Sequence, residues 1–260
     1  MTFLRLLHAE WTKLRTTSGP AWLLLAGIAV TVALGAAVTA AMTCPQRGCG
    51  LDPTRLSLAG VYLGQAPVAI LAVLAISGEH STGLIRTTLT AMPRRPAVLT
   101  AKATVLALAV AASGGVALLA ALLVARAILP ANGFTPARGY PPLSLADGPT
   151  LRAYAGTLLY LVLVALLSLG IGAVLRDSAA AIGTVLGLLY LPPLLALSID
   201  NAHWQRLLDR AAPMSAGLAI QTTTGPDTAP IGPWAGLAVL AAWATGALLT
   251  GTLLLQHRDP

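Results

Sequence analysis

The chain has 260 residues, of which 56% are hydrophobic and only 10% are charged. Soluble domains carry about 25% charged residues, so this composition argues against a water-soluble globular protein. A formal net charge of +7 could indicate nucleic-acid binding, but here the basic residues flank apolar runs and form no single patch. We therefore expect a membrane protein that binds the lipid bilayer and no nucleic acid.

Six stretches of 22 or more residues contain no Asp, Glu, Lys or Arg. A helix of about 20 apolar residues crosses the hydrocarbon core of a bilayer, which is about 30 Å thick. The predicted fold class is an all-α polytopic membrane protein with six transmembrane helices, and residues 1–260 form one transmembrane domain. The predicted spans are Gly19–Thr43, Leu56–Gly78, Ala103–Ala125, Ala153–Leu175, Ser178–Ile199 and Pro233–Leu255.

Residues 2–15, before the first span, predict a short amphipathic helix. At 100° per residue, Leu7, Trp11 and Leu14 fall on one apolar face, while basic and polar residues occupy most of the remainder and Glu10 lies at the boundary. Such a helix lies in the headgroup plane of the bilayer. The alternative is an ordinary basic flank that is helical by accident.

Two cysteines, Cys44 and Cys49, lie in the loop that follows the first span. Outside the cytosol such a pair can oxidise and close a tight loop. In a cytosolic loop it would suggest a metal or redox site, but no second pair and no nearby histidine completes one. The sequence leaves a disulfide and two free thiols equally open.

The connection between the second and third predicted spans, residues 79–102, is long for a helix hairpin, which can be closed by about five residues. Ser81 or Thr82 can cap a short helix, and Pro93 would end it. This length and regularity indicate a cytosolic docking surface. The apolar residues that share one side of the helix are Leu84, Ile85, Leu89 and Met92.

Two later connections differ sharply in length. Arg176-Asp177 is a tight turn that makes the fourth and fifth spans an antiparallel hairpin. Residues 200–232 are long and rich in apolar side chains, which predicts a short re-entrant or interfacial helix.

Glycines four residues apart occur at Gly60 and Gly64, and again at Gly183 and Gly187. This spacing allows helices to approach closely, within one chain or between subunits. In a chain with 25 glycines the spacing also arises by chance.

The basic residues predict that both termini lie in the cytosol. With the N-terminus inside, the cytosolic segments hold nine Lys and Arg in 49 residues, and the outer loops hold seven in 72. Cytosolic loops carry the excess of basic residues in membrane proteins. This orientation places residues 79–102 inside and both cysteines outside.

The span interiors contain no Asp, Glu, Lys, Arg or His, which argues against an ion-driven carrier. The chain also lacks the glycine-rich loop with Lys-Ser/Thr that holds nucleotide phosphates, and it has no metalloprotease motif. We expect no catalytic residue, no metal and no cofactor in this chain. A transporter of this kind must draw its energy from a separate ATPase.

Three segments carry a resemblance to a known family: A-E-W-T-K-L-R-T-T at Ala9–Thr17, G-E-H-S-T-G-L-I-R-T-T-L-T-A-M-P-R-R at Gly78–Arg95, and the basic end His257–Pro260. The chain resembles the six-span permease subunit of type 2 ABC transporters, of the kind common in actinobacteria. The resemblance implies a bacterial plasma membrane, an interfacial connecting helix, and a coupling helix that contacts the ATPase through Glu79, Arg86 and Ser81–Met92. It also implies two permease subunits, as a homodimer or heterodimer, and two ATPase subunits.

The leading hypothesis is an ATP-driven exporter in which this chain forms the translocation pathway. A non-transporting membrane scaffold or immunity protein is the alternative, and an uncoupled small-solute carrier is a third. Hydroxyls expected along the pathway, in a lining otherwise rich in Leu, Ala and Val, suit amphipathic or lipid-like cargo. They belong to Tyr62, Tyr160, Ser168 and Tyr190.

Overall fold

The computed structural model describes residues 3–44, 49–81, 95–225 and 230–257, and these form helices and loops without a strand. Six of the helices are long and apolar enough to cross a membrane. The predicted helical fold class is thereby confirmed, together with six helices that are long and apolar enough to span a membrane. The six are α2 (Ser18–Ala41), α4 (Val61–Ser81), α6 (Arg95–Ile128), α7 (Gly148–Leu175), α8 (Ser178–Ser198) and α11 (Pro233–His257).

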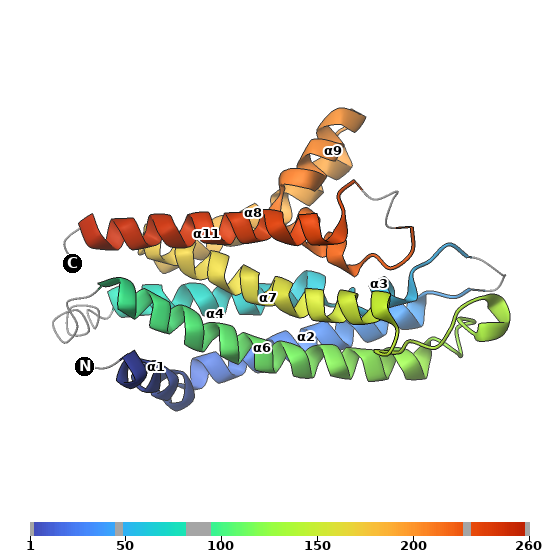
Figure 1. Cartoon of the computed structure of the whole chain (residues 1–260), viewed down its shortest axis with the longest axis horizontal. Coiled ribbons are helices and arrows are strands. Elements are labelled where there is room, and N and C mark those ends of the chain that lie inside the picture. The colour runs from blue at the N-terminus through green and yellow to red at the C-terminus, as the bar shows by residue number, and fades with distance from the viewer. Residues whose placement is uncertain (1–2, 45–48, 82–94, 226–229, 258–260) are drawn as a thin grey trace.

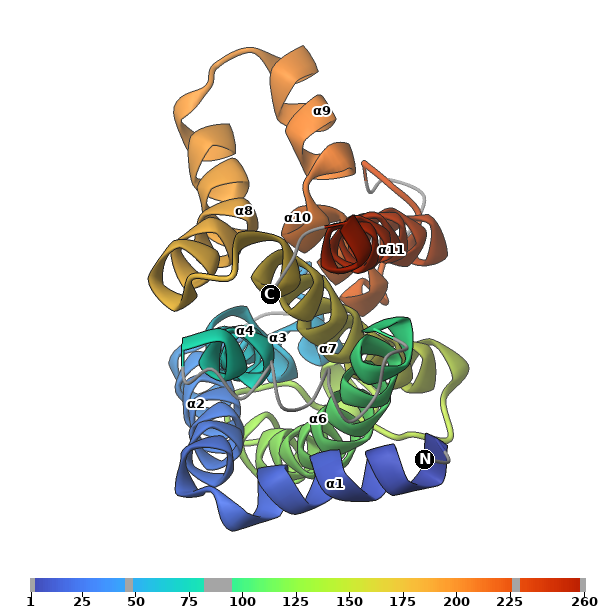
Figure 2. The same ribbon diagram turned by 90° about the vertical axis from the view of Figure 1, so that its left-hand side faces the viewer.

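The long helices run along one common direction, and the shorter elements gather at the two ends of the bundle (Figure 1). At one end, called the α1 end below, α1 (Phe3–Thr16) crosses the ends of α2 and α6 (Figure 2). The opposite end, called the disulfide end, holds Cys44 and the short helices α3 (Pro53–Ser57) and η1 (Pro136–Arg138).

The segment between α8 and α11 is also helical. It contains α9 (Ala202–Ala211), α10 (Pro213–Leu218) and η2 (Ala219–Gln221). α9 projects sideways from the bundle, whereas α10 and η2 pack against α11 (Figure 1). A helix in this segment agrees with the apolar content of residues 200–232.

α7 lies at the centre of the bundle and packs against α4, α6, α8 and α11. In the most apolar stretch of each span, 56% of the residues are buried in α4 and in α7, but only 17% are buried in α8. Most of the α8 surface is therefore left to lipid or to another protein.

The second span begins at Val61, later than the predicted Leu56, because a short separate helix precedes it. The Asp52 side chain accepts hydrogen bonds from the backbone amides of Thr54 (3.0 Å) and Arg55 (3.2 Å), which caps α3. A turn after α3 then leads into α4. Charge-free runs in the sequence thus predict where the long apolar helices lie, but they do not predict the residues at which these helices begin and end.

The first glycine pair permits a close approach between α2 and the start of α4. A Cβ atom added at Gly60 would overlap the carbonyl group of Thr31 in α2, and one at Gly64 would overlap the Thr31 hydroxyl. Gly183 in α8 has no neighbouring atom within 4 Å. Glycines at the same spacing therefore allow close helix packing between α2 and α4, but Gly183 of α8 faces open space.

Candidate functional site

The predicted ATPase-coupling residues Leu84, Ile85, Arg86, Leu89 and Met92 lie outside the described residues, as do the side chains of Glu79 and Ser81. The helices on either side of this segment are described. α4 ends at Ser81 and α6 begins at Arg95, both at the α1 end of the bundle.

α1 has three distinct faces. Leu6 and Glu10 are buried against the bundle, and Leu7 and Leu14 are half-buried. Trp11 remains 49% exposed on the apolar face, where a bilayer would cover it. The remaining face is polar and exposed, so the predicted apolar grouping of Leu7, Trp11 and Leu14 is only partly covered by protein.

A buried ion pair fixes α1 to α6. The Lys102 ammonium lies 2.7 Å from one carboxylate oxygen of Glu10, and these side chains are only 4% and 7% exposed. The Lys13 ammonium lies 2.9 Å from the other oxygen of Glu10. Leu6 also packs with Val98 and Ala101 of α6 in a small hydrophobic cluster that is separate from the main core.

Sequence reasoning missed this pair, because Glu10 looked like a boundary residue of an amphipathic helix and Lys102 like the last residue of a loop. The available signal was a lone acidic residue within a basic flank. Because both side chains are almost fully buried, the pair ties α1 to α6 at a place where water cannot replace either partner.

At the disulfide end, side chains tie the loops to one another. The structure joins Cys44 to Cys49 with a Cα–Cα distance of 5.9 Å, and Cys44 is fully buried. The Cys44 carbonyl accepts a hydrogen bond of 2.6 Å from Arg138. Asp52 also accepts bonds of 2.7 Å from both the backbone amide and the hydroxyl of Thr223, 171 residues away in the sequence.

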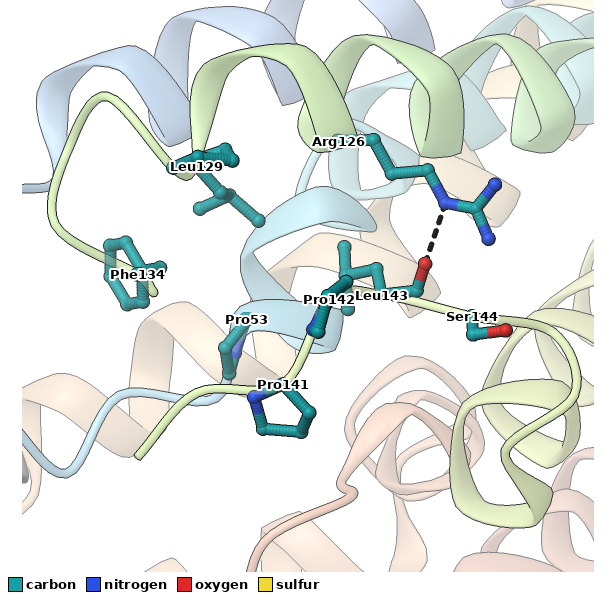
Figure 3. Close-up of a pocket in the computed structure, with 9 residues that line it drawn as sticks. Pro53, Arg126, Leu129, Phe134, Pro141, Pro142, Leu143 and Ser144 are labelled. Atoms are coloured by element: carbon teal, nitrogen blue, oxygen red, sulfur yellow. Dashed lines mark hydrogen bonds between the residues drawn. The ribbon is translucent and has the colours of Figure 1, made fainter. Parts of the chain in front are cut away.

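A small cavity of about 380 Å³ lies beneath the loop that follows α6 (Figure 3). Its one charged lining residue is Arg126, whose Nε donates a 2.6 Å hydrogen bond to the Leu143 carbonyl. Pro53, Pro141 and Pro142 contribute much of the remaining wall. This arrangement holds the loop against α6, and we interpret it as structural.

A larger cavity of about 970 Å³ lies among α3, α4, α8, α9 and α10. It combines charged and polar residues with apolar ones, as ligand sites in proteins commonly do. The polar lining includes Asp52, Arg55, Tyr62 and Asp209, and the apolar lining includes Leu56, Leu197, Met214 and Leu218.

A buried group of hydrogen bonds, called the Gln65 knot below, adjoins this cavity. Gln65 is fully buried and donates to the Tyr62 carbonyl at 3.0 Å and to the Met214 sulfur at 3.2 Å. The Tyr160 hydroxyl donates to the Gln65 side-chain oxygen. The Tyr190 hydroxyl donates to the Tyr62 carbonyl at 2.6 Å, so the knot joins α4, α7, α8 and α10.

Three of the four hydroxyl residues expected along a pathway meet in the Gln65 knot, and Ser168 lies apart from them. Tyr62 lines the large cavity, and the Tyr190 hydroxyl donates to the Tyr62 carbonyl. Tyr160 and Ser168 are fully buried, and the Ser168 hydroxyl donates to the Val164 carbonyl within α7 at 2.7 Å. Periodicity in an apolar helix does not reveal which hydroxyl faces a cavity, because every face is apolar.

The described part of the chain contains no group of three or more His, Cys, Asp or Glu residues that could hold a metal ion. The chain matches no protein-family model and no curated protein sequence.

Proposed function

We propose that this chain is the membrane-spanning permease subunit of an ATP-driven ABC exporter, energised by a separate ATPase subunit. The observation that carries the proposal is the meeting of two distant segments at the α1 end. α1 contains most of the Ala9–Thr17 motif and is fixed by Glu10 to Lys102 of α6. α6 begins at Arg95, the last residue of the second motif.

In this proposal the α1 end faces the cytosol and the disulfide end faces the outside of a bacterial plasma membrane. The excess of basic residues in the segments at the α1 end supports this orientation. The pairing of Cys44 with Cys49 is compatible with it, because disulfides persist outside the cytosol. α1 would then lie in the inner headgroup layer with Trp11 as its anchor.

The segment between α4 and α6 would receive the movement of the ATPase. Leu84, Ile85 and Leu89 would fill an apolar cleft on that subunit, while Glu79 and Arg86 would set the orientation through charge-assisted hydrogen bonds. Because α1 is held on α6 by a buried ion pair, α1 would move with α6. A second permease subunit, identical or a sibling, would complete the pathway.

Co-purification tests the proposed contact. The chain would be expressed with the ATPase subunit encoded nearest to it and purified through a tag on the chain. Arg86→Glu and Leu89→Pro should each reduce the amount of bound ATPase at least about tenfold, since the first reverses a charge and the second would break the helix that the sequence predicts there. Arg206→Glu, an exposed charge reversal on α9, which projects sideways from the bundle away from α1, should leave the ATPase bound. Unchanged recovery in both test variants would contradict the coupling role.

A further inference from the structure

Charged side chains of opposite sign line the large cavity at the disulfide end, and solvent reaches both of them: Arg55 is exposed and Asp209 is half-exposed. Arg55 comes from α3 and Asp209 from α9, and both line the cavity. Within the described ranges, neither side chain has a hydrogen-bond or ion-pair partner. Asp52, which lines the same cavity, differs because its oxygens already bind Thr54, Arg55 and Thr223 backbone amides.

The other walls are apolar. Leu56, Leu197, Met214 and Leu218 line the cavity, and Tyr62 adds an aromatic ring beside the Gln65 knot. Its volume of about 970 Å³ is at the upper end of the range for sites that enclose small ligands. A ligand that fits these walls carries one negative group, one positive group and a substantial apolar body.

We infer that this cavity binds an amphiphile with a zwitterionic head group, of which a phosphoethanolamine lipid is the simplest membrane example. The Arg55 guanidinium presents the planar donor pair that binds phosphate oxygens, and the Asp209 carboxylate accepts hydrogen bonds from a primary ammonium. The apolar walls cover the part of the ligand next to the head group. This inference deepens the proposed function, because it names a ligand class for the cavity of the permease.

Equilibrium binding of radiolabelled lyso-phosphatidylethanolamine to the purified full-length chain in a non-ionic detergent tests the inference. Three comparison ligands keep the acyl chain and change the head: lyso-phosphatidylglycerol is only anionic, an alkylamine is only cationic, and monoacylglycerol is neutral. We expect the zwitterion to bind at least about tenfold more tightly than monoacylglycerol, as expected for charge-assisted hydrogen bonds. Equal affinity for the two would show partition into the detergent belt and would overturn the inference.

Variants show which group of the ligand each charged side chain binds. Arg55→Gln and Asp209→Asn should each weaken zwitterion binding about tenfold. The alkylamine should lose affinity only with Asp209→Asn, and lyso-phosphatidylglycerol only with Arg55→Gln. Arg206→Gln and Asp200→Asn remove the same charges from exposed positions outside the cavity and should change nothing.

Melting curves should show that all four variants fold, since each altered side chain is at least partly exposed. If the control variants lose as much affinity as the test variants, or if only one of the two charges matters, the zwitterion site is wrong. The measurement needs neither ATPase nor ATP, so a failure here leaves the permease proposal standing. Conversely, zwitterion binding by a chain that does not couple to an ATPase would support the lipid site and contradict the exporter proposal.

Discussion

Two spans of nearly equal mean hydropathy, α4 and α8, have opposite surroundings. In the most apolar stretch, 56% of α4 is buried inside the protein but only 17% of α8. The glycine pair that starts α4 packs against Thr31, whereas Gly183 in α8 faces open space. Apolar composition therefore shows that a helix enters the bilayer, but it does not show whether protein or lipid covers it, because both are apolar.

The two amphipathic helices repeat this contrast. α1 buries Glu10 in an ion pair with Lys102 and is part of the packed bundle. α9 has no buried residue along its length, and side-chain bonds to backbone carbonyls hold it, including Gln205 to Ile199 at 2.6 Å and Trp243 to Ala211 at 3.0 Å. We call α8 and α9 the arm, and α1, α2, α4, α6, α7 and α11 the body.

Substitutions at positions that are buried in the body should lower the free energy of unfolding far more than matched substitutions in the arm.

The largest difference in unfolding free energy between body and arm is expected for the ion pair of the body. Lys102→Met leaves Glu10 buried with Lys13 as its remaining partner, and we expect a loss of about 3 kcal/mol in unfolding free energy. Arg206→Met in the arm removes an exposed charge and should change it by less than about 0.5 kcal/mol. SDS titration in mixed micelles measures both.

The double variant Glu10→Leu with Lys102→Met is the control for this mechanism. It removes both charges, and apolar replacement of a buried pair is often close to neutral, so most of the lost stability should return. An equal loss of unfolding free energy in the single and the double variant would show that packing volume, and not the lost pairing of the Glu10 carboxylate with Lys102, determines the effect.

The next largest difference in stability is expected between alanine substitutions at Gly60 and at Gly183. Gly60→Ala places a methyl group on the Thr31 carbonyl, so α2 and α4 must separate, at a cost of about 2 kcal/mol. Gly183→Ala meets nothing within 4 Å and gains helix propensity, so the isolated chain should be as stable or slightly more stable. Melting temperatures of the two purified variants make the comparison, and an equal decrease in both would contradict the assigned packing.

The smallest difference is expected at polar residues. Gln65→Leu leaves the Tyr160 hydroxyl without its acceptor in the bundle interior, and we expect a cost of about 1 kcal/mol. Thr184→Val in the arm changes an exposed side chain and should be nearly neutral. If Gln65→Leu with Tyr160→Phe is as unstable as Gln65→Leu alone, the unpaired hydroxyl is not the cause.

The sequence was sufficient for features that depend on local composition. Charge-free runs located six spans, the placement of Leu7, Trp11 and Leu14 indicated α1, and apolar content indicated a helix within residues 200–232. All of these features are properties of neighbouring residues, which determine helix formation and transfer into lipid.

The remaining features depend on contacts between distant residues. Glu10 and Lys102 are 92 positions apart, and Asp52 reaches Thr223 across 171 positions. No local pattern specifies such partners, so neither the ion pair nor the shape of the large cavity could be predicted. For the same reason the sequence did not distinguish Tyr62, which lines the cavity, from Ser168, which is buried in α7.

The central claim is that a separate ATPase drives this chain through the α1 end, and ATP hydrolysis in proteoliposomes tests it without knowledge of the cargo. Vesicles holding the ATPase subunit with the wild-type chain should hydrolyse ATP several-fold faster than vesicles with the ATPase alone. Arg86→Glu should abolish this stimulation, and Arg206→Glu on α9 should retain it. Identical hydrolysis rates with and without the chain would contradict the permease account and favour a non-transporting scaffold.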